Sequence, residues 1–248
     1  MILTTSTSDL QETELYLLPP SHPAFSKLSE IFINIKRPLT SEVSLKNLGF
    51  VFLREDWRKD RGKVPIATHS SKELSNYIFK FYVSKDYKKT SRLKDRCKFS
   101  RRAQKVVEEM HLEKYFFIPK KYLFPLRRIR GEKLNRFMLV EDKVSFLKND
   151  NFAKFWRSEK IYEYLLPVAK LLWHSRIKDL QPSNLKRNED GKMSLFDTES
   201  GSERFKASFV AINYWLKRNK ENKGWNYQRF SVLWEKACRK AKKKTPLI

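Results

Sequence analysis

Residues Ile177–Glu199, with the sequence IKDLQPSNLKRNEDGKMSLFDTE, carry the clearest motif of this chain. In it, Asn184 follows Asp179 after four intervening residues, and Asp197 follows Asn184 after twelve more. The Asn-Glu-Asp-Gly sequence at 188–191 predicts a tight turn, because Asp-Gly supplies the positive-φ residues that a short hairpin needs. The stretch therefore predicts a loop, a hairpin and a carboxylate at the hairpin's end. The apolar residues expected in its two short strands are Leu185, Met193 and Leu195.

Such a loop and hairpin can bring Asp179, Asn184 and Asp197 around one site. Their oxygen atoms suit a hard cation such as Mg²⁺, which keeps several waters and binds through one or two carboxylates plus substrate phosphates. We expect Asn184 and Asp197 to hold Mg²⁺, with Glu199 supporting the metal. The alternative is a polar hairpin whose carboxylates are close in sequence by chance.

This pattern resembles the catalytic loop and the metal-binding Asp of the protein-kinase-like superfamily. It is closer to the aminoglycoside-phosphotransferase and small bacterial kinase branch, whose second motif is often I-D-x-E and here reads Phe-Asp-Thr-Glu at 196–199. The sequence departs from the superfamily at Ile177, where His is usual, and at Lys178, where Arg is usual. The resemblance implies a reduced two-lobed α+β fold with a β-rich amino lobe and a small helical carboxy lobe. It also implies transfer of the γ-phosphoryl of ATP, with Asp179 orienting or deprotonating the acceptor.

A lysine lies inside the clearest strand of the chain, Tyr77–Val83. Ile78, Lys80 and Tyr82 share one face by period-two alternation, and burying a lysine there without a partner would be costly. The resemblance implies that Lys80 holds the α- and β-phosphates of ATP. The alternative is an edge-strand lysine that prevents aggregation.

The segment Ser91–Leu112 is expected to form a basic helix. The resemblance implies that this helix carries a glutamate that pairs with Lys80. Glu108 is the candidate, with Glu109 and Gln104 as rivals, although an ordinary solvated glutamate is the alternative. The basic residues of this helix, which form a docking face or a solvated surface, are Arg92, Lys94, Arg96, Lys98, Arg101, Arg102 and Lys105.

A strand expected at Arg136–Val140 leads into a linker that begins with Glu141 and Asp142. The resemblance places the hinge here, so that Glu141 and Asp142 lie where the cofactor's adenine would bind. A Gly-rich phosphate loop should precede Lys80, but the sequence offers few glycines there. Either backbone amides of Ala67–Ser71 cover the phosphates, or ATP is bound poorly.

The remaining elements follow from periodicity and breaker residues. Short strands are expected at Tyr115–Ile118 and Tyr122–Leu126, and Val43–Leu53 fits a strand pair or a helix followed by a strand. The remaining expected helices are Phe25–Phe32, Asn151–Trp156, Ile161–His174 with a kink or a new segment at Pro167, Ser202–Leu216, and Asn226–Lys242.

Composition bounds the possible classes of protein. With 248 residues, 40% of them hydrophobic, the chain can bury a proper core. Two cysteines, Cys97 and Cys238, are typical of a reducing compartment, and no apolar run predicts a transmembrane helix. Since the start also lacks a secretory signal, we expect a cytoplasmic protein, with export into a host cell as the alternative. Residues 1–23 are expected to be a flexible lead-in, 24–140 the amino lobe, and 141–248 the hinge and carboxy lobe.

The formal charge of +25 predicts weak, non-specific attraction to polyanions. Three functions therefore remain open. The first is an ATP–Mg²⁺-dependent phosphotransferase whose unknown acceptor is an acidic protein or a phosphorylated ligand. The second is a catalytically inactive kinase-like module, a pseudokinase, that docks a partner on its basic face. The third is a nucleic-acid-binding protein, which the charge favours although no recognised module is present.

Overall fold

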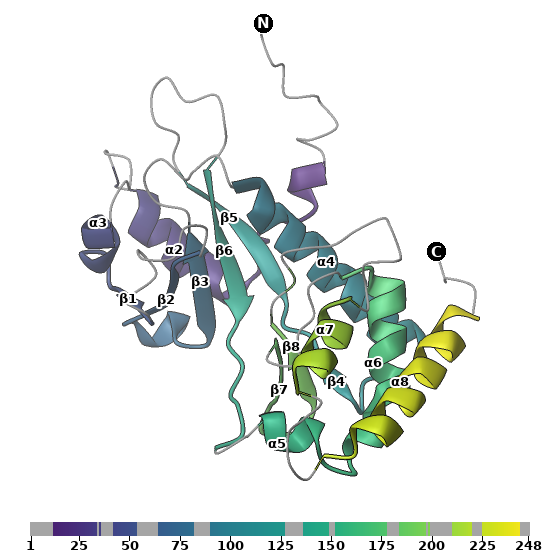
Figure 1. Cartoon of the computed structure of the whole chain (residues 1–248). Helices are drawn as coiled ribbons and strands as arrows, with labels where there is room; N and C mark the ends of the chain where they lie inside the picture. The colour runs from purple at the N-terminus through teal and green to yellow at the C-terminus, as the bar shows by residue number, and fades with distance from the viewer. Residues whose placement is uncertain are drawn as a thin grey trace, which may run out of the picture. The chain divides into compact units, whose positions relative to one another are not determined.

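The computed structural model of the chain describes residues 12–33, 35, 42–53, 64–81, 90–126, 136–148, 152–177, 184–196, 198, 210–219 and 225–243. The protein is of the mixed α+β class, with helices and two separate sheets (Figure 1). The chain divides into two compact units, of which the first comprises 1–97 and 120–143 and the second comprises 98–119 and 144–248. The expected amino lobe had included residues 98–119, which belong to the second unit instead.

The first unit is built on a five-stranded antiparallel sheet with the order β1-β2-β3-β6-β5 (Figure 1). Its strands are β1 (Phe50–Phe52), β2 (Ile66–His69), β3 (Tyr77–Phe81), β5 (Lys121–Leu126) and β6 (Arg136–Asp142). Its helices are α2 (Pro23–Ile33), α3 (Glu42–Lys46), the 3₁₀ helix η2 (Lys72–Leu74) and the first two turns of α4 (Thr90–Glu109).

The two faces of this sheet pack against different helices. On one face, Phe79 and Val140, which lie opposite each other, share a core with Ala24 and Leu28 of α2. Residues on the other face are offset by one position along each strand. The core of that second face is formed by Leu123, Leu139, Leu93, Cys97, Tyr16 and Val64.

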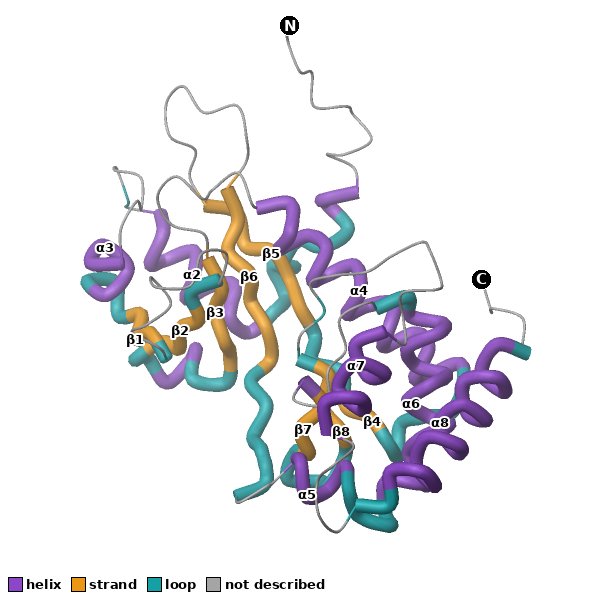
Figure 2. The backbone as a smooth tube through the Cα atoms, viewed as in Figure 1, coloured by secondary structure: helices purple, strands orange, loops and turns teal. Residues whose placement is uncertain are grey.

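The second unit contains a three-stranded sheet with the order β4-β8-β7, in which β4 pairs parallel and β7 antiparallel to β8 (Figure 2). Its strands are β4 (Phe116–Phe117), β7 (Leu185–Arg187) and β8 (Met193–Leu195). Its helices are the rest of α4, α5 (Phe152–Trp156), α6 (Ile161–Ser175), α7 (Val210–Asn219) and α8 (Tyr227–Lys242). The amphipathic α6 and α8 lie side by side and supply much of the core, including Leu165, Val168, Leu172, Phe230, Trp234 and Ala237.

Most of the expected elements are present. Helix α2 confirms the Phe25–Phe32 prediction, and the Val43–Leu53 stretch forms a helix followed by a strand. Helix α6 runs through the buried Pro167 without starting a new segment. Helix α7 begins at Val210, and the expected helix residues 202–209 lie outside the described part of the chain.

One boundary prediction was wrong in a way that matters for the site. The strand expected to end at Val140 continues through Glu141 and Asp142 as β6, because both residues keep pairing with β3. Among the described helices, none is long and apolar enough to cross a membrane.

Candidate functional site

Lys80 is buried on the sheet face that the start of α4 covers. Its ammonium nitrogen Nζ donates a hydrogen bond to Glu141 Oε2 at 2.5 Å. The sheet register explains this pair, because Lys80 lies opposite Leu139 and Glu141 is two residues further along β6 on the same face. Glu141 thus supplies the opposite charge that a buried lysine requires.

The expected partner of Lys80 had been Glu108, and this pairing was wrong. Glu108 is an exposed residue in the part of α4 that belongs to the second unit. The two rival residues have other partners. Glu109 Oε1 lies 3.5 Å from Lys105 Nζ, and the Gln104 side-chain amide donates a hydrogen bond to the Ile118 carbonyl at 3.2 Å. The carboxylate that neutralises Lys80 therefore comes from a neighbouring strand rather than from a helix.

A second buried lysine shares the Glu141 carboxylate. Lys121 lies directly opposite Glu141 in the register, and its Nζ atom is 3.6 Å from Glu141 Oε1. Burial disfavours the Glu141 carboxylate, but the charges of Lys121 and Lys80, the hydrogen bond from Lys80 and the charge of Arg96 outweigh burial and lower the pKa of Glu141. Glu141 is therefore ionised at neutral pH within a strongly cationic group.

Sequence reasoning missed Lys121 and Arg96. Lys121 had been assigned to the break between two strands, and Arg96 to a solvated or docking helix face. The alternation of Lys121 with Leu123 along β5 is the signal that could have placed this lysine on the inner face.

Among the described residues of the sheet face that carries Lys80, most of those on β5 and β6 are buried, whereas those at the β1 edge are exposed. Val51 and Leu53, at the β1 edge, are each 53% exposed. Leu53 is joined to β2 by a hydrogen bond from its N–H to the Ile66 carbonyl, and Ile66 lies directly opposite Lys80. Among the described residues, Lys80 therefore lies between the covered part of this face and an open apolar half formed by Val51, Leu53 and the half-buried Ile66, which was not foreseen.

The segment expected to cover phosphates with its backbone amides, Ala67–Ser71, uses them inside the fold. Residues 67–69 belong to β2, which is paired on both sides. The Ser70 N–H donates to the Gly49 carbonyl at 2.9 Å, and the Ser71 N–H donates to His69 Nδ1 at 3.0 Å. Of the two alternatives for this segment, phosphate cover by its amides is therefore the less favoured, because the Ser70 and Ser71 amides already have partners.

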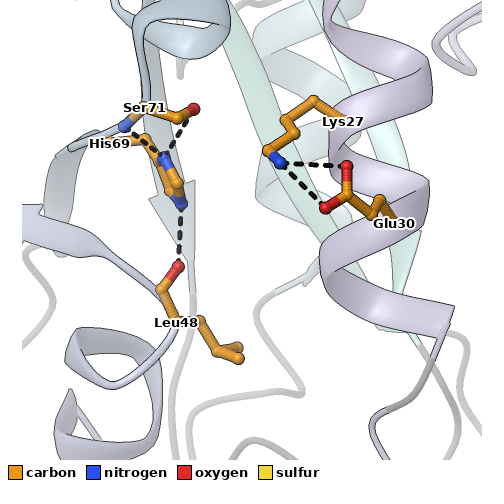
Figure 3. A network of polar contacts seen from close by, with 5 residues as sticks. All are labelled: Lys27, Glu30, Leu48, His69 and Ser71. Atoms are coloured by element: carbon orange, nitrogen blue, oxygen red, sulfur yellow. Dashed lines mark hydrogen bonds and ion pairs between the residues drawn. The ribbon is translucent and has the colours of Figure 1, made fainter.

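His69 fixes the turn between α3 and β1, as Figure 3 shows. Its Nε2 atom is 2.8 Å from the Leu48 carbonyl, while Nδ1 contacts Ser71. Gly49 adopts a φ of +91°, and a side chain there would meet His69 and Ser70 at under 3.0 Å. The same view shows the exposed pair of Lys27 with Glu30 on α2, at 2.8 Å.

Asp142, expected at the hinge, ends β6 on the opposite sheet face. Its Oδ2 atom accepts a hydrogen bond from the Lys120 N–H at 3.2 Å. Burial raises the pKa of Asp142, and the lost solvation outweighs that bond and the charges of His22 and Lys120. The His22 ring packs between Tyr77 and Tyr122, with centroids 5.2 and 4.9 Å away.

The predicted hairpin is present in the second unit. Strands β7 and β8 pair antiparallel with Leu185 opposite Leu195, and the turn closes through the Gly191 N–H, which donates to the Asn188 carbonyl at 2.9 Å. Asn188 Oδ1 also accepts from the Lys192 N–H at 2.9 Å. Asn184 immediately precedes β7, so the register directs it toward the end of the hairpin from which the chain leaves β8.

The other motif residues, Asp179, Asp197 and Glu199, lie outside the described residues. Helix α6 ends at Ser175 and delivers the chain to residues 178–183, as expected for the helix before the motif. In the described ranges, no three His, Cys, Asp or Glu side chains form a metal-binding group.

His174 is buried near the end of α6, and its backbone carbonyl accepts a hydrogen bond from Arg102 Nε at 3.2 Å. Burial lowers the pKa of His174, despite a hydrogen bond with the backbone of Ala241 that raises it.

Comparison with known proteins gave no family assignment: no protein-family model matches the chain, and no curated protein is significantly similar to it.

Proposed function

We propose that this chain is an atypical kinase, an ATP–Mg²⁺-dependent phosphotransferase. One observation carries the proposal: Lys80 lies at the border of an open apolar half of the same sheet face. A purine base gains from contact with apolar side chains such as Val51 and Leu53, and phosphates gain from a neighbouring ammonium. These residues fit a nucleotide with its base over β1–β2 and its phosphates toward Lys80.

The pair with Glu141 is compatible with phosphate binding by Lys80. An ammonium group has three N–H donors, and Glu141 Oε2 accepts one of them. Glu141 holds the side chain in one place, so that less conformational entropy is lost when a phosphate binds. The charges of Lys121 and Arg96, which help to lower the pKa of Glu141, also favour an anion nearby.

The remaining roles rest on the resemblance and on the hairpin. ATP would supply the phosphoryl group, and Mg²⁺ would offset its charge. Asn184 and Asp197 would hold the metal, with Glu199 in support. Asp179 would orient the acceptor hydroxyl and take its proton.

A pair of variants tests this proposal because it demands an asymmetry. Asp197→Asn removes a charge that offsets Mg²⁺, so both nucleotide affinity and phosphoryl transfer should fall. Asp179→Asn should abolish transfer and leave nucleotide binding nearly intact, since this residue faces the acceptor. Calorimetry with ATP–Mg²⁺ and an assay of ATP turnover measure the two effects. If both variants bind and turn over ATP like the parent, the proposed roles are wrong.

A second function, a kinase-like module without catalysis, is favoured by the engaged amides of Ser70 and Ser71. Without them, one expected source of phosphate contacts is lost, which weakens transfer more than binding. A parent protein that binds ATP–Mg²⁺ but never turns it over would support this inactive module over the enzyme.

A further inference from the structure

The outward face of α8 is a continuous basic stripe in the second unit. Four exposed cations of α8 and its C-cap residue are spaced as i, i+3, i+4 and i+7 and therefore fall within an arc of about 100°. They are Lys236, Arg239, Lys240 and Lys243. The opposite face of α8 is buried through Phe230, Trp234, Ala237 and Ala241, so the helix is anchored beside α6 (Figure 1).

These charges are not balanced within the described part of the chain. Helix α8 contains a single acidic residue, Glu235, and no ion pair joins the four stripe cations to another described residue. Arg229, near the start of the helix, differs in that it pairs with Glu159 at 3.0 Å. Cations stabilise a helix's last turn through its dipole, but this effect does not reach back to Lys236.

Two further features accompany the stripe. Val232, one turn before Lys236, is 63% exposed and continues the same face. Beside the stripe, a hollow of about 250 Å³ between α7 and α8 is lined by Asn213, Arg239 and Lys242, among other residues. An exposed aliphatic side chain gains little from the phosphate backbone of a nucleic acid, but it gains from burial at the boundary between lipid headgroups and acyl chains.

We propose that this face of α8 is a docking surface for an anionic lipid bilayer. Each Lys or Arg near such a surface strengthens binding by about fivefold, so four aligned cations suffice for reversible attachment. The apolar face of α8 is already buried in the core, so only Val232 reaches the boundary between headgroups and acyl chains and the helix inserts no further. Binding that depends on these charges must weaken as salt screens them.

The test measures sedimentation of the full chain with phosphatidylcholine vesicles, with and without phosphatidylglycerol. The stripe variant is Lys236→Glu/Lys240→Glu. The matched control is Lys72→Glu/Lys148→Glu, which makes the same change in net charge at exposed positions outside α8. We expect the parent to bind only the anionic vesicles, the stripe variant to bind at least tenfold more weakly, and the control to stay within about threefold of the parent.

Three results would overturn the proposal. The parent could fail to bind anionic vesicles, or the stripe and control variants could lose affinity equally, which would assign binding to net charge alone. Alternatively, the parent could bind polyuridylate or duplex DNA more tightly than vesicles at equal phosphate concentration. If only the stripe variant then lost this affinity, α8 would be a nucleic-acid-binding surface. Circular dichroism of each variant establishes that it is folded. A further variant, Val232→Ser, keeps every charge. It should weaken vesicle binding at high salt and leave polynucleotide binding unchanged.

Discussion

Lys80 Nζ donates to Glu141 Oε2 at 2.5 Å between adjacent antiparallel strands, and Lys121 Nζ lies 3.6 Å from the other oxygen of the same carboxylate. The strands β3, β6 and β5 thus contribute one charge each to a buried group. Because a one-residue slip would move these side chains to the opposite face, the group fits only one register of the sheet.

Removing the carboxylate should destabilise the fold strongly. Glu141→Gln leaves Lys80 and Lys121 buried without their shared counter-charge, which costs about 3–5 kcal/mol when a buried pair is broken. Glu108→Gln, at an exposed position, should change the free energy of unfolding by less than about 0.5 kcal/mol. Urea denaturation of both variants measures the difference, and similar small effects would show that the Glu141 group contributes little.

Acid should weaken the protein through two histidines. Burial lowers the pKa of both His22 and His174 from the value of 6.5 that they regain on unfolding. Below about pH 6.5 the unfolded chain therefore binds protons that the folded chain does not, so stability falls until the folded-state pKa values are reached. The free energy of unfolding, measured by urea titration from pH 7.5 to 5, should decrease over this interval.

The contribution of His22 to this pH dependence of stability can be isolated by substitution. Its Nδ1 atom accepts the Ala24 N–H at 3.2 Å, a role that Asn can keep at a helix start without titrating. We expect His22→Asn to flatten the pH dependence. His111→Asn, at an exposed residue with a φ of +53° that Asn tolerates, is the matched substitution for comparison. If His22→Asn retains the full slope, His22 is not a source of the acid sensitivity.

The open half of the sheet should contribute to nucleotide affinity without contributing to stability. Leu53→Glu places a negative charge beside the proposed base and phosphates and should weaken ATP–Mg²⁺ binding by about tenfold, or ~1.4 kcal/mol. Val43→Glu, also at an exposed apolar residue of the first unit, is the matched control and should bind like the parent. Fluorescence titration with a labelled nucleotide compares them, and equal affinities would exclude the open half as the binding surface.

Local sequence patterns predicted which segments form helices and strands better than they predicted which strands and side chains pair. The Asp-Gly turn placed the hairpin of β7 and β8, because turn chemistry acts over a few residues. The alternation in β3 predicted that Ile78 and Lys80 share a face, which the register confirms. The Lys80–Glu141 pair could not be predicted, since it depends on which strand lies beside β3, and Glu141 is sixty-one residues away in sequence.

The candidate site was predicted only in part for the same reason. The charged run at Glu141 and Asp142 is typical of a linker, and only pairing with β3 keeps it in a strand. The open apolar half over β1 and β2 depends on where α4 packs, which a strand pattern does not encode. Asn184 was placed correctly beside the hairpin because that relation is local.

Calorimetry of ATP–Mg²⁺ binding to the parent, Lys80→Met and Lys72→Met tests whether Lys80 belongs to a nucleotide site. Lys80→Met keeps the volume of the side chain and leaves Glu141 paired with Lys121, whereas Lys72→Met removes the same charge at an exposed position. We expect Kd to rise at least tenfold, or ~1.4 kcal/mol, for Lys80→Met alone. Equal affinities in all three proteins, or no binding by the folded parent, would contradict a nucleotide site at Lys80.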